Sequence, residues 1–269
     1  MDERGYLIII GGAEDKHGES EILRQAPQML SEGELLTVLT TATEHPEEAG
    51  ANYERTFRRL GVRRIQILHI ETRCDAEEES NCELIRASKC IFITGGDQLR
   101  ITSILGGTRA YTELKNCYAR GGIIIGTSAG ASVMSSTMVV EGMDNEPARK
   151  CTLKMAPGLG LVGGVIIDQH FDQRGRFGRL LCGVAENPDV LGIGIDEDTA
   201  IKLYPDLHFE ILGSNAVTII DGSSIQGSNV SESNANEILA IMGVTVHALP
   251  KGYGFTLSDR KVLRLNDGN

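Results

Sequence analysis

A serine flanked by small residues is the strongest chemical signal in the chain. Residues 126–130 are Gly-Thr-Ser-Ala-Gly, a G-x-S-x-G motif centred on Ser128, and the apolar run of residues 123–125 precedes them. A strand that turns sharply into a helix holds such a serine hydroxyl clear of the sheet, where a neighbouring base activates it. The sequence therefore predicts a nucleophile at Ser128, against the alternative of a tight turn with an inert serine.

A nucleophilic serine needs a base, and His170 is the candidate among the six histidines. It follows an apolar run that begins at Val165, which places it at the carboxyl end of a predicted strand, level with the Ser128 turn. A carboxylate should orient the imidazole and stabilise its cation. The segment 194–200 offers three carboxylates for this role, and position along the chain does not choose among them: Asp196, Glu197 and Asp198.

An oxyanion needs two aimed backbone N–H groups. Ala129, directly after the predicted nucleophile, supplies one from the start of a helix. The loop Gly95-Gly96-Asp97 supplies the other, from Gly96 or Asp97, because glycine allows close approach of the backbone. The order serine, histidine, acid differs from the order serine, acid, histidine of α/β-hydrolases, and this disfavours an ordinary esterase.

Alternating strands and helices must position these groups. Apolar runs predict strands and the segments between them predict helices, a pattern typical of βαβ units whose parallel sheet binds ligands beyond the carboxyl ends of its strands. The predicted strands are residues 6–10, 35–39, 64–70, 90–94, 123–125 and 165–171, and the predicted helices are 20–32, 47–60, 77–88, 98–105, 109–120 and 176–185. Residues 190–203, 211–220 and 244–265 have strand or hairpin patterns, and a polar loop is expected at 223–236. Without a linker or composition break, we expect one domain over residues 1–269.

Composition excludes several classes of protein. The formal net charge of −11 disfavours nucleic-acid binding, and we expect no nucleic-acid partner. No uncharged apolar run approaches the ~18 residues of a membrane span, so we expect no membrane segment. The six cysteines include no C-x-x-C pair and none has zinc-ligand spacing with a histidine, so we expect reduced thiols, a cytoplasmic protein, and neither metal nor cofactor.

Five motifs together resemble the serine peptidase family that contains cyanophycinase and aspartyl dipeptidase. They are residues 11–16 (GGAEDK), 94–98 (TGGDQ), 126–131 (GTSAGA), 168–171 (DQHF) with Arg174, Arg176 and Arg179, and 194–200 (GIDEDTA). The resemblance covers nearly the whole chain in order. It implies a flavodoxin-like α/β sandwich with a mostly parallel central sheet, related to class I glutamine amidotransferases, and a homodimer. It also implies the triad Ser128, His170 and Glu197, and so selects one of the three carboxylates.

The resemblance further implies hydrolysis of the storage polymer cyanophycin to β-Asp-Arg dipeptides by a serine exopeptidase. The polymer has a poly-aspartate backbone with an arginine on each side chain, so each repeat exposes an arginine carboxylate that guanidinium groups bind as forks. The expected substrate-binding residues are Gln98, Arg100, Asp168, Gln169, Asp172, Arg174, Arg176 and Arg179. Asp168, Asp172 or Glu14 would meet the substrate guanidinium, and Arg100 would replace a lysine that the family often has nearby.

Two other functions remain open at this stage. One is a related peptidase that cleaves aspartyl or isoaspartyl dipeptides, and the other is a catalytically inactive homologue that binds polymer granules. Products from short Asp-X peptides distinguish the first, and polymer binding without covalent labelling of Ser128 distinguishes the second.

Overall fold

Strands of the computed structural model form two main sheets, and the structure describes residues 4–265. The larger sheet has nine strands in the order β17-β16-β11-β10-β1-β5-β4-β2-β3. Its parallel strands are β1 (Tyr6–Ile10), β5 (Ile123–Thr127), β4 (Cys90–Ile93), β2 (Leu35–Leu39) and β3 (Arg64–Leu68). Four antiparallel strands extend it from β1: β10 (Thr199–Leu203), β11 (His208–Gly213), β16 (Tyr253–Thr256) and β17 (Lys261–Arg264).

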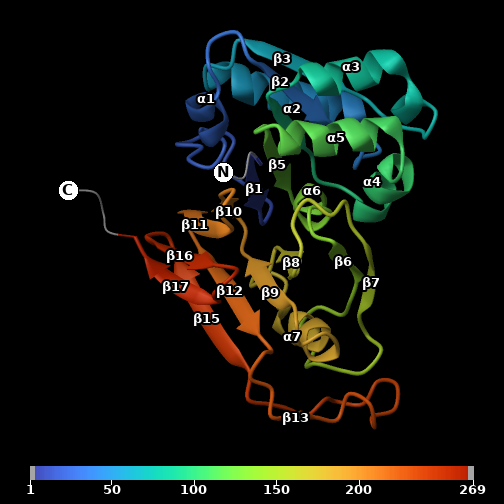
Figure 1. Ribbon diagram of the computed structural model, residues 1–269, viewed down its shortest axis with the longest axis vertical. Helices are drawn as coiled ribbons and strands as arrows, with labels where there is room; N and C mark the ends of the chain where they lie inside the picture. The colour runs from blue at the N-terminus through green and yellow to red at the C-terminus, as the bar shows by residue number, and fades with distance from the viewer. Residues whose placement is uncertain (1–3, 266–269) are drawn as a thin grey trace.

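A smaller sheet of four strands has the order β15-β12-β9-β8. It contains β15 (Thr245–Pro250), β12 (Ala216–Asp221), β9 (Leu191–Ile195) and β8 (Val165–Gln169), of which β8 and β9 are parallel. Two hairpin-like pairs complete the strands: β6 (Thr137–Glu141) with β7 (Lys154–Pro157), and β13 (Gly227–Ser228) with β14 (Ile241–Met242). Figure 1 shows the smaller sheet below the parallel strands of the larger one, with β16 and β17 of the larger sheet at its side and β13 at the lower end of the molecule.

Helices cover both faces of the larger sheet because its central strands are apolar on both sides. Leu7 and Ile9 of β1 pack in one apolar cluster, and Ile8 and Ile10 pack in another. The second cluster includes α1 (Gln25–Met29) and α2 (Pro46–Arg59). The first includes α3 (Glu79–Ala87), α4 (Gln98–Leu105) and α5 (Arg109–Ala119), and it also contains apolar residues of the smaller sheet. The outer face of that sheet packs on α7 (Phe177–Glu186).

The two sheets meet where their parallel strands end. The N–H of His170, one residue beyond β8, donates to the Gly11 carbonyl beyond β1 over 2.8 Å. The N–H of Asp198, between β9 and β10, donates to the Gly12 carbonyl over 2.9 Å. Segments that follow β1, β8 and β9 are thereby brought to one edge, beside the short helix α6 (Ala129–Ser132) that follows β5.

The predicted α/β fold with a mostly parallel central sheet is confirmed, with some differences in its elements. The predicted helix 20–32 is helical only over Gln25–Met29, and a short 3-10 helix (Asp75–Glu77) precedes α3. The run 190–203 forms two strands in different sheets, because the chain turns at residues 196–198. The predicted loop 223–236 contains the two residues of β13, and β6 and β7 were not predicted. Among residues 4–265, no helix is long and apolar enough to cross a membrane.

Candidate active site

Ser128 lies at a strained turn between β5 and α6. Its backbone has φ 52° and ψ −112°, a left-handed conformation that costs on the order of 1–3 kcal/mol for a residue with a side chain. Hydrogen bonds hold it there, since its N–H donates to the Ile10 carbonyl over 3.0 Å and its carbonyl accepts from the N–H groups of Ala131 and Ser132. The turn presents the serine side chain beyond the carboxyl end of the parallel sheet.

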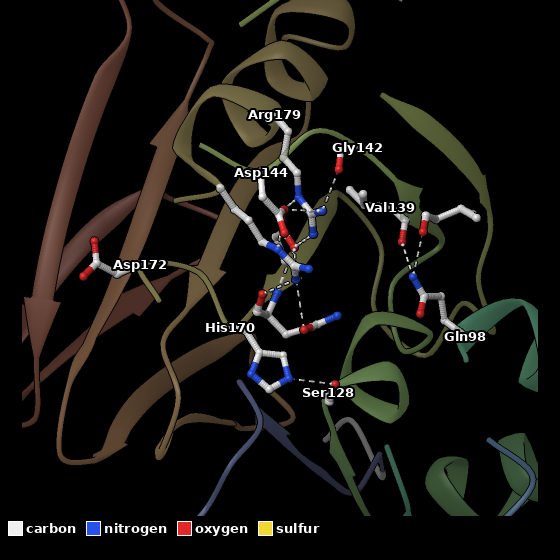
Figure 2. Close-up of polar contacts among 12 residues, drawn as sticks. Gln98, Ser128, Val139, Gly142, Asp144, His170, Asp172 and Arg179 are labelled. Atoms are coloured by element: carbon white, nitrogen blue, oxygen red, sulfur yellow. Dashed lines mark hydrogen bonds and ion pairs between the residues drawn. The ribbon is translucent and has the colours of Figure 1, made fainter. Parts of the chain in front are cut away.

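The His170 imidazole joins Ser128 to Glu197. Its Nε2 lies 3.0 Å from Ser128 Oγ, and its Nδ1 lies 2.6 Å from Glu197 Oε1. With Nδ1–H donating to the carboxylate, Nε2 accepts the serine proton, which is the geometry of a nucleophile, a base and an orienting acid. Figure 2 shows the imidazole of His170 directed at Ser128, with the contact dashed.

Gly12 makes room for this imidazole. Its φ is +100°, and a Cβ built there would lie 2.3 Å from His170 Cε1 and 2.5 Å from His170 Nε2. Any side chain at this position would push the ring away from Ser128. The Gly11-Gly12 pair therefore serves the site by its lack of side chains and by its two carbonyls, which hold the backbones of His170 and Asp198.

The three carboxylates of the 196–198 turn have different partners. Asp196 accepts backbone N–H bonds from Asp172 and Ala216, and burial raises its pKa. Asp198 accepts from the Asp15 N–H over 2.9 Å and from the Ser214 hydroxyl over 2.8 Å. Within residues 4–265, Glu197 is the member of this turn that contacts His170.

Burial lowers the pKa of His170 from its ordinary value of 6.5, and this effect exceeds the opposing one of Glu197. The positive charges of Arg174 and Arg176 lower the pKa further, while the hydrogen bond to Glu197 raises it. The imidazole is therefore mostly neutral at neutral pH, which is the form that accepts a proton from Ser128.

The loop that follows β4 lies against the nucleophile. A Cβ on Gly95 would lie 3.2 Å from Ser128 Cβ, and Gly96 has a φ of +145° with a Cβ position only 2.1 Å from the Ala42 carbonyl oxygen. The Asp97 N–H donates to that same carbonyl over 2.8 Å, and its side chain caps α4. Asp97 is therefore engaged elsewhere, and Gly96 and Ala129 are the expected donors whose N–H groups have no partner within residues 4–265.

Arg176 and Arg179 are buried in an ion-pair network with Asp168 and Asp144. The two arginines are 6% and 7% exposed and Asp168 is 1% exposed. Arg179 binds Asp168 through two nitrogens, Nε at 2.6 Å from Oδ2 and Nη2 with Oδ1, and Arg176 Nε lies 3.0 Å from Asp144 Oδ1. Figure 2 shows Arg179 and Asp144 together above His170. Because Asp168 already binds guanidinium groups of this chain, we replace its expected substrate role by one of holding the arginines.

Among the other expected substrate residues, the two amides and Arg100 contact other parts of the chain, whereas Arg174 and Asp172 are exposed. Gln98 donates to the Val139 and Val140 carbonyls of β6, and Gln169 accepts from Arg176, so both amides hold other elements in place. Arg174 is exposed, and no hydrogen-bond partner of its side chain occurs within residues 4–265. Arg100 donates from Nε to the Thr41 carbonyl over 3.0 Å. Asp172 is exposed, and Figure 2 shows its carboxylate apart from Ser128 and His170, so the structure does not bring it into the cluster.

Sequence reasoning missed the contacts of Glu14 and the role of Asp144. The Glu14 side chain is fully buried, 2.9 Å from Lys16 Nζ, and it accepts hydrogen bonds from Tyr53 and from Thr127, each at 2.6 Å. It therefore supports the residue before the nucleophile instead of facing the substrate. Its place in the GGAEDK motif was a signal of importance, but the partners Tyr53 and Thr127 come from distant segments that no local pattern connects.

The fold, with a serine, a histidine and a glutamate in consecutive hydrogen-bond contact, is that of an α/β serine hydrolase. No cluster of three or more histidine, cysteine or acidic side chains that could hold a metal occurs within residues 4–265. The model of Peptidase family S51 matches residues 7–209, so the chain belongs to this family of serine-type peptidases.

Similar proteins agree with this membership. The chain is 38% identical over 260 residues to a cyanophycinase of Trichormus variabilis, covering 96% of this chain and 87% of the relative. It is 36% identical over 263 residues to a cyanophycinase of Synechococcus elongatus, covering 96% and 81%. The crystal structure of a peptidase from an acI-B1 Actinobacterium has the same fold, with a TM-score of 0.68 at 21% identity, covering 95% of this chain and 98% of that one.

Proposed function

We propose that the protein is a serine exopeptidase that hydrolyses cyanophycin, multi-L-arginyl-poly-L-aspartate, to β-Asp-Arg dipeptides. The hydrogen-bonded series Ser128, His170 and Glu197 carries the proposal, with distances of 3.0 and 2.6 Å. Support for the substrate comes from the relatives named cyanophycinase, which match nearly the whole chain.

Acyl transfer follows from the arrangement of these side chains. His170 Nε2 takes the Ser128 proton while Oγ attacks the aspartyl main-chain carbonyl, and the N–H groups of Gly96 and Ala129 stabilise the oxyanion. The imidazolium, stabilised by Glu197, then gives its proton to the departing amine, and an acyl-enzyme on Ser128 remains. Water, deprotonated by the same imidazole, hydrolyses the ester and restores the serine hydroxyl.

Product analysis tests the proposal. The protein is incubated with purified cyanophycin and the products are identified by mass. Release of β-Asp-Arg supports it, and Ser128→Ala should reduce that release by several orders of magnitude. Free arginine would indicate isopeptide cleavage, and hydrolysis of short Asp-X peptides without action on the polymer would indicate an aspartyl dipeptidase. Polymer binding without labelling of Ser128 by a serine-reactive probe would indicate a binding protein.

We also propose a cytoplasmic homodimer. The homodimer follows from the family resemblance, and the free state of Cys74, Cys82, Cys90, Cys117, Cys151 and Cys182 fits a reducing compartment. The molar mass in solution by light scattering tests the first part, and a value of about 29 kDa, that of one chain, would contradict it.

A further inference from the structure

A groove continues from the oxyanion loop along the carboxyl edge of the larger sheet. Its volume is about 1060 Å³, and residues that follow three neighbouring strands line it: Gly96 after β4, Thr43 to His45 after β2, and Glu71 after β3. Because the sheet order is β5-β4-β2-β3, the groove leads away from the Ser128 turn toward the edge of the sheet.

The groove begins next to the nucleophile. Gly95 lies against Ser128 and the following residue, Gly96, lines the groove. Residues of α4 and Pro157 of β7 also line it. The Gln98 amide fixes these elements relative to each other by donating to two carbonyls of β6, the partner strand of β7. The groove is thus an extension of the site whose lining elements are held together by hydrogen bonds.

Both signs of charge line the groove. Glu44 and Glu71 are exposed carboxylates, and Arg100 and His45 supply a guanidinium and an imidazole. The side chain of Leu99, 43% exposed, adds an apolar surface on which a long aliphatic stem can pack. Such a lining suits a ligand that carries guanidinium and carboxylate groups on flexible stems, with carboxylates paired to guanidinium as charge-assisted forks.

We propose that this groove binds further repeats of the polymer, beyond those that flank the scissile bond, with Glu44 and Glu71 receiving arginine guanidinium groups. The inference rests on the proposed function and specifies how the site engages a long substrate. Sites for drug-sized ligands occupy roughly 300–1,000 Å³, so a groove of about 1060 Å³ accommodates at least one complete β-Asp-Arg repeat. A two-repeat substrate, which has only the repeats that flank the scissile bond, would not reach it.

The test compares two substrates in a charge-matched pair of variants. Glu44→Gln/Glu71→Gln removes both groove carboxylates, and Glu78→Gln/Glu83→Gln makes the same charge change at exposed positions outside the groove. KM and kcat are measured for cyanophycin and for a two-repeat substrate. We expect the ratio of the polymer KM to the two-repeat KM to rise about tenfold in the groove variant and to stay unchanged in the control. In a Ser128→Ala background, direct polymer binding should weaken to the same extent.

Two results would overturn the groove as a polymer site. One is an unchanged KM ratio in the groove variant, whether both KM values stay the same or rise equally, and the other is an equal effect of the control variant. Failure of the wild-type protein to cleave cyanophycin at all would refute the proposed function, and the groove proposal with it. That result differs from cleavage of cyanophycin that is unchanged by loss of the groove carboxylates, which would refute the groove proposal alone.

Discussion

Replacement of Gly12 by alanine tests whether a missing side chain sets the catalytic geometry. The new Cβ would lie 2.3 Å from His170 Cε1, more than an ångström inside the 3.4 Å at which ordinary contact begins. The imidazole must move by about that much. The distance between Ser128 Oγ and His170 Nε2, now 3.0 Å, would then be longer than a hydrogen bond.

Displacement of a catalytic group by about 1 Å costs on the order of 100-fold in rate, so kcat of Gly12→Ala should fall at least that far. The backbone contributes a separate effect on stability, because alanine at a φ of +100° is strained by about 1–3 kcal/mol. A control must therefore reproduce the strain without the collision.

Gly61 provides that control, since its φ is +101° and a Cβ there would meet nothing within 4 Å. Gly61→Ala should lower the melting temperature by about 2–4 °C for each kcal/mol of strain and leave kcat unchanged. Steady-state kinetics and thermal unfolding of both variants check this. A kcat of Gly12→Ala within threefold of wild type would refute the reasoning, and so would an equal loss of kcat in Gly61→Ala.

Three further predictions concern the acid, the base and the buried ion pairs. Glu197→Gln should lower kcat by about 10⁴-fold at an unchanged fold, because the imidazole loses its orienting acid; steady-state assays that find a tenfold loss or less would contradict this. Arg174→Gln should raise the pKa of His170, since the Arg174 charge lowers it, so the acid limb of the pH profile of kcat/KM should move to higher pH; Arg174→Lys keeps the charge and should leave the limb in place. Arg179→Met leaves the Asp168 carboxylate buried without its main partner and should cost about 3–5 kcal/mol, or roughly 6–20 °C in melting temperature; a thermal melt within 2 °C of wild type would show that the pair is dispensable.

Local patterns predicted much of the parallel half of the larger sheet. The strands at residues 6–10 and 35–39 appear with the predicted bounds, because continuous apolar runs closed by glycine or threonine are a local signal of a buried strand. The turn at Ser128 was also predicted, since small residues after an apolar run permit the sharp change of direction. Residues 20–24 lacked the helix that their composition suggested, and only α1 formed, because tertiary packing overrides weak propensity.

The two-sheet arrangement could not be predicted from the run of residues 190–203. That run is mainly apolar on both sides of the turn, apart from Thr199 and Lys202, and its two halves hydrogen-bond to partners as distant as β1 and β12. Similarly, the arginines that follow His170 suggested substrate forks, whereas Asp144 pairs with two of them from a segment about thirty residues away. A residue pattern records which groups are available but leaves open which distant group each one meets.

By itself, the sequence determined the type of chemistry available: a serine on a strand-to-helix turn, a histidine at a strand end and an acidic turn further on. These features are local, because they depend on residue types and on the conformations of a few neighbouring peptides. The tertiary structure brought Glu197, which the family resemblance but no local pattern had selected, into contact with His170. It also decided which backbone N–H groups beside Ser128 have no partner within residues 4–265, and that Arg176 and Arg179 are buried with carboxylates of the same chain. Those choices depend on the closure of two sheets against each other, which brings together atoms that the chain separates by dozens of residues.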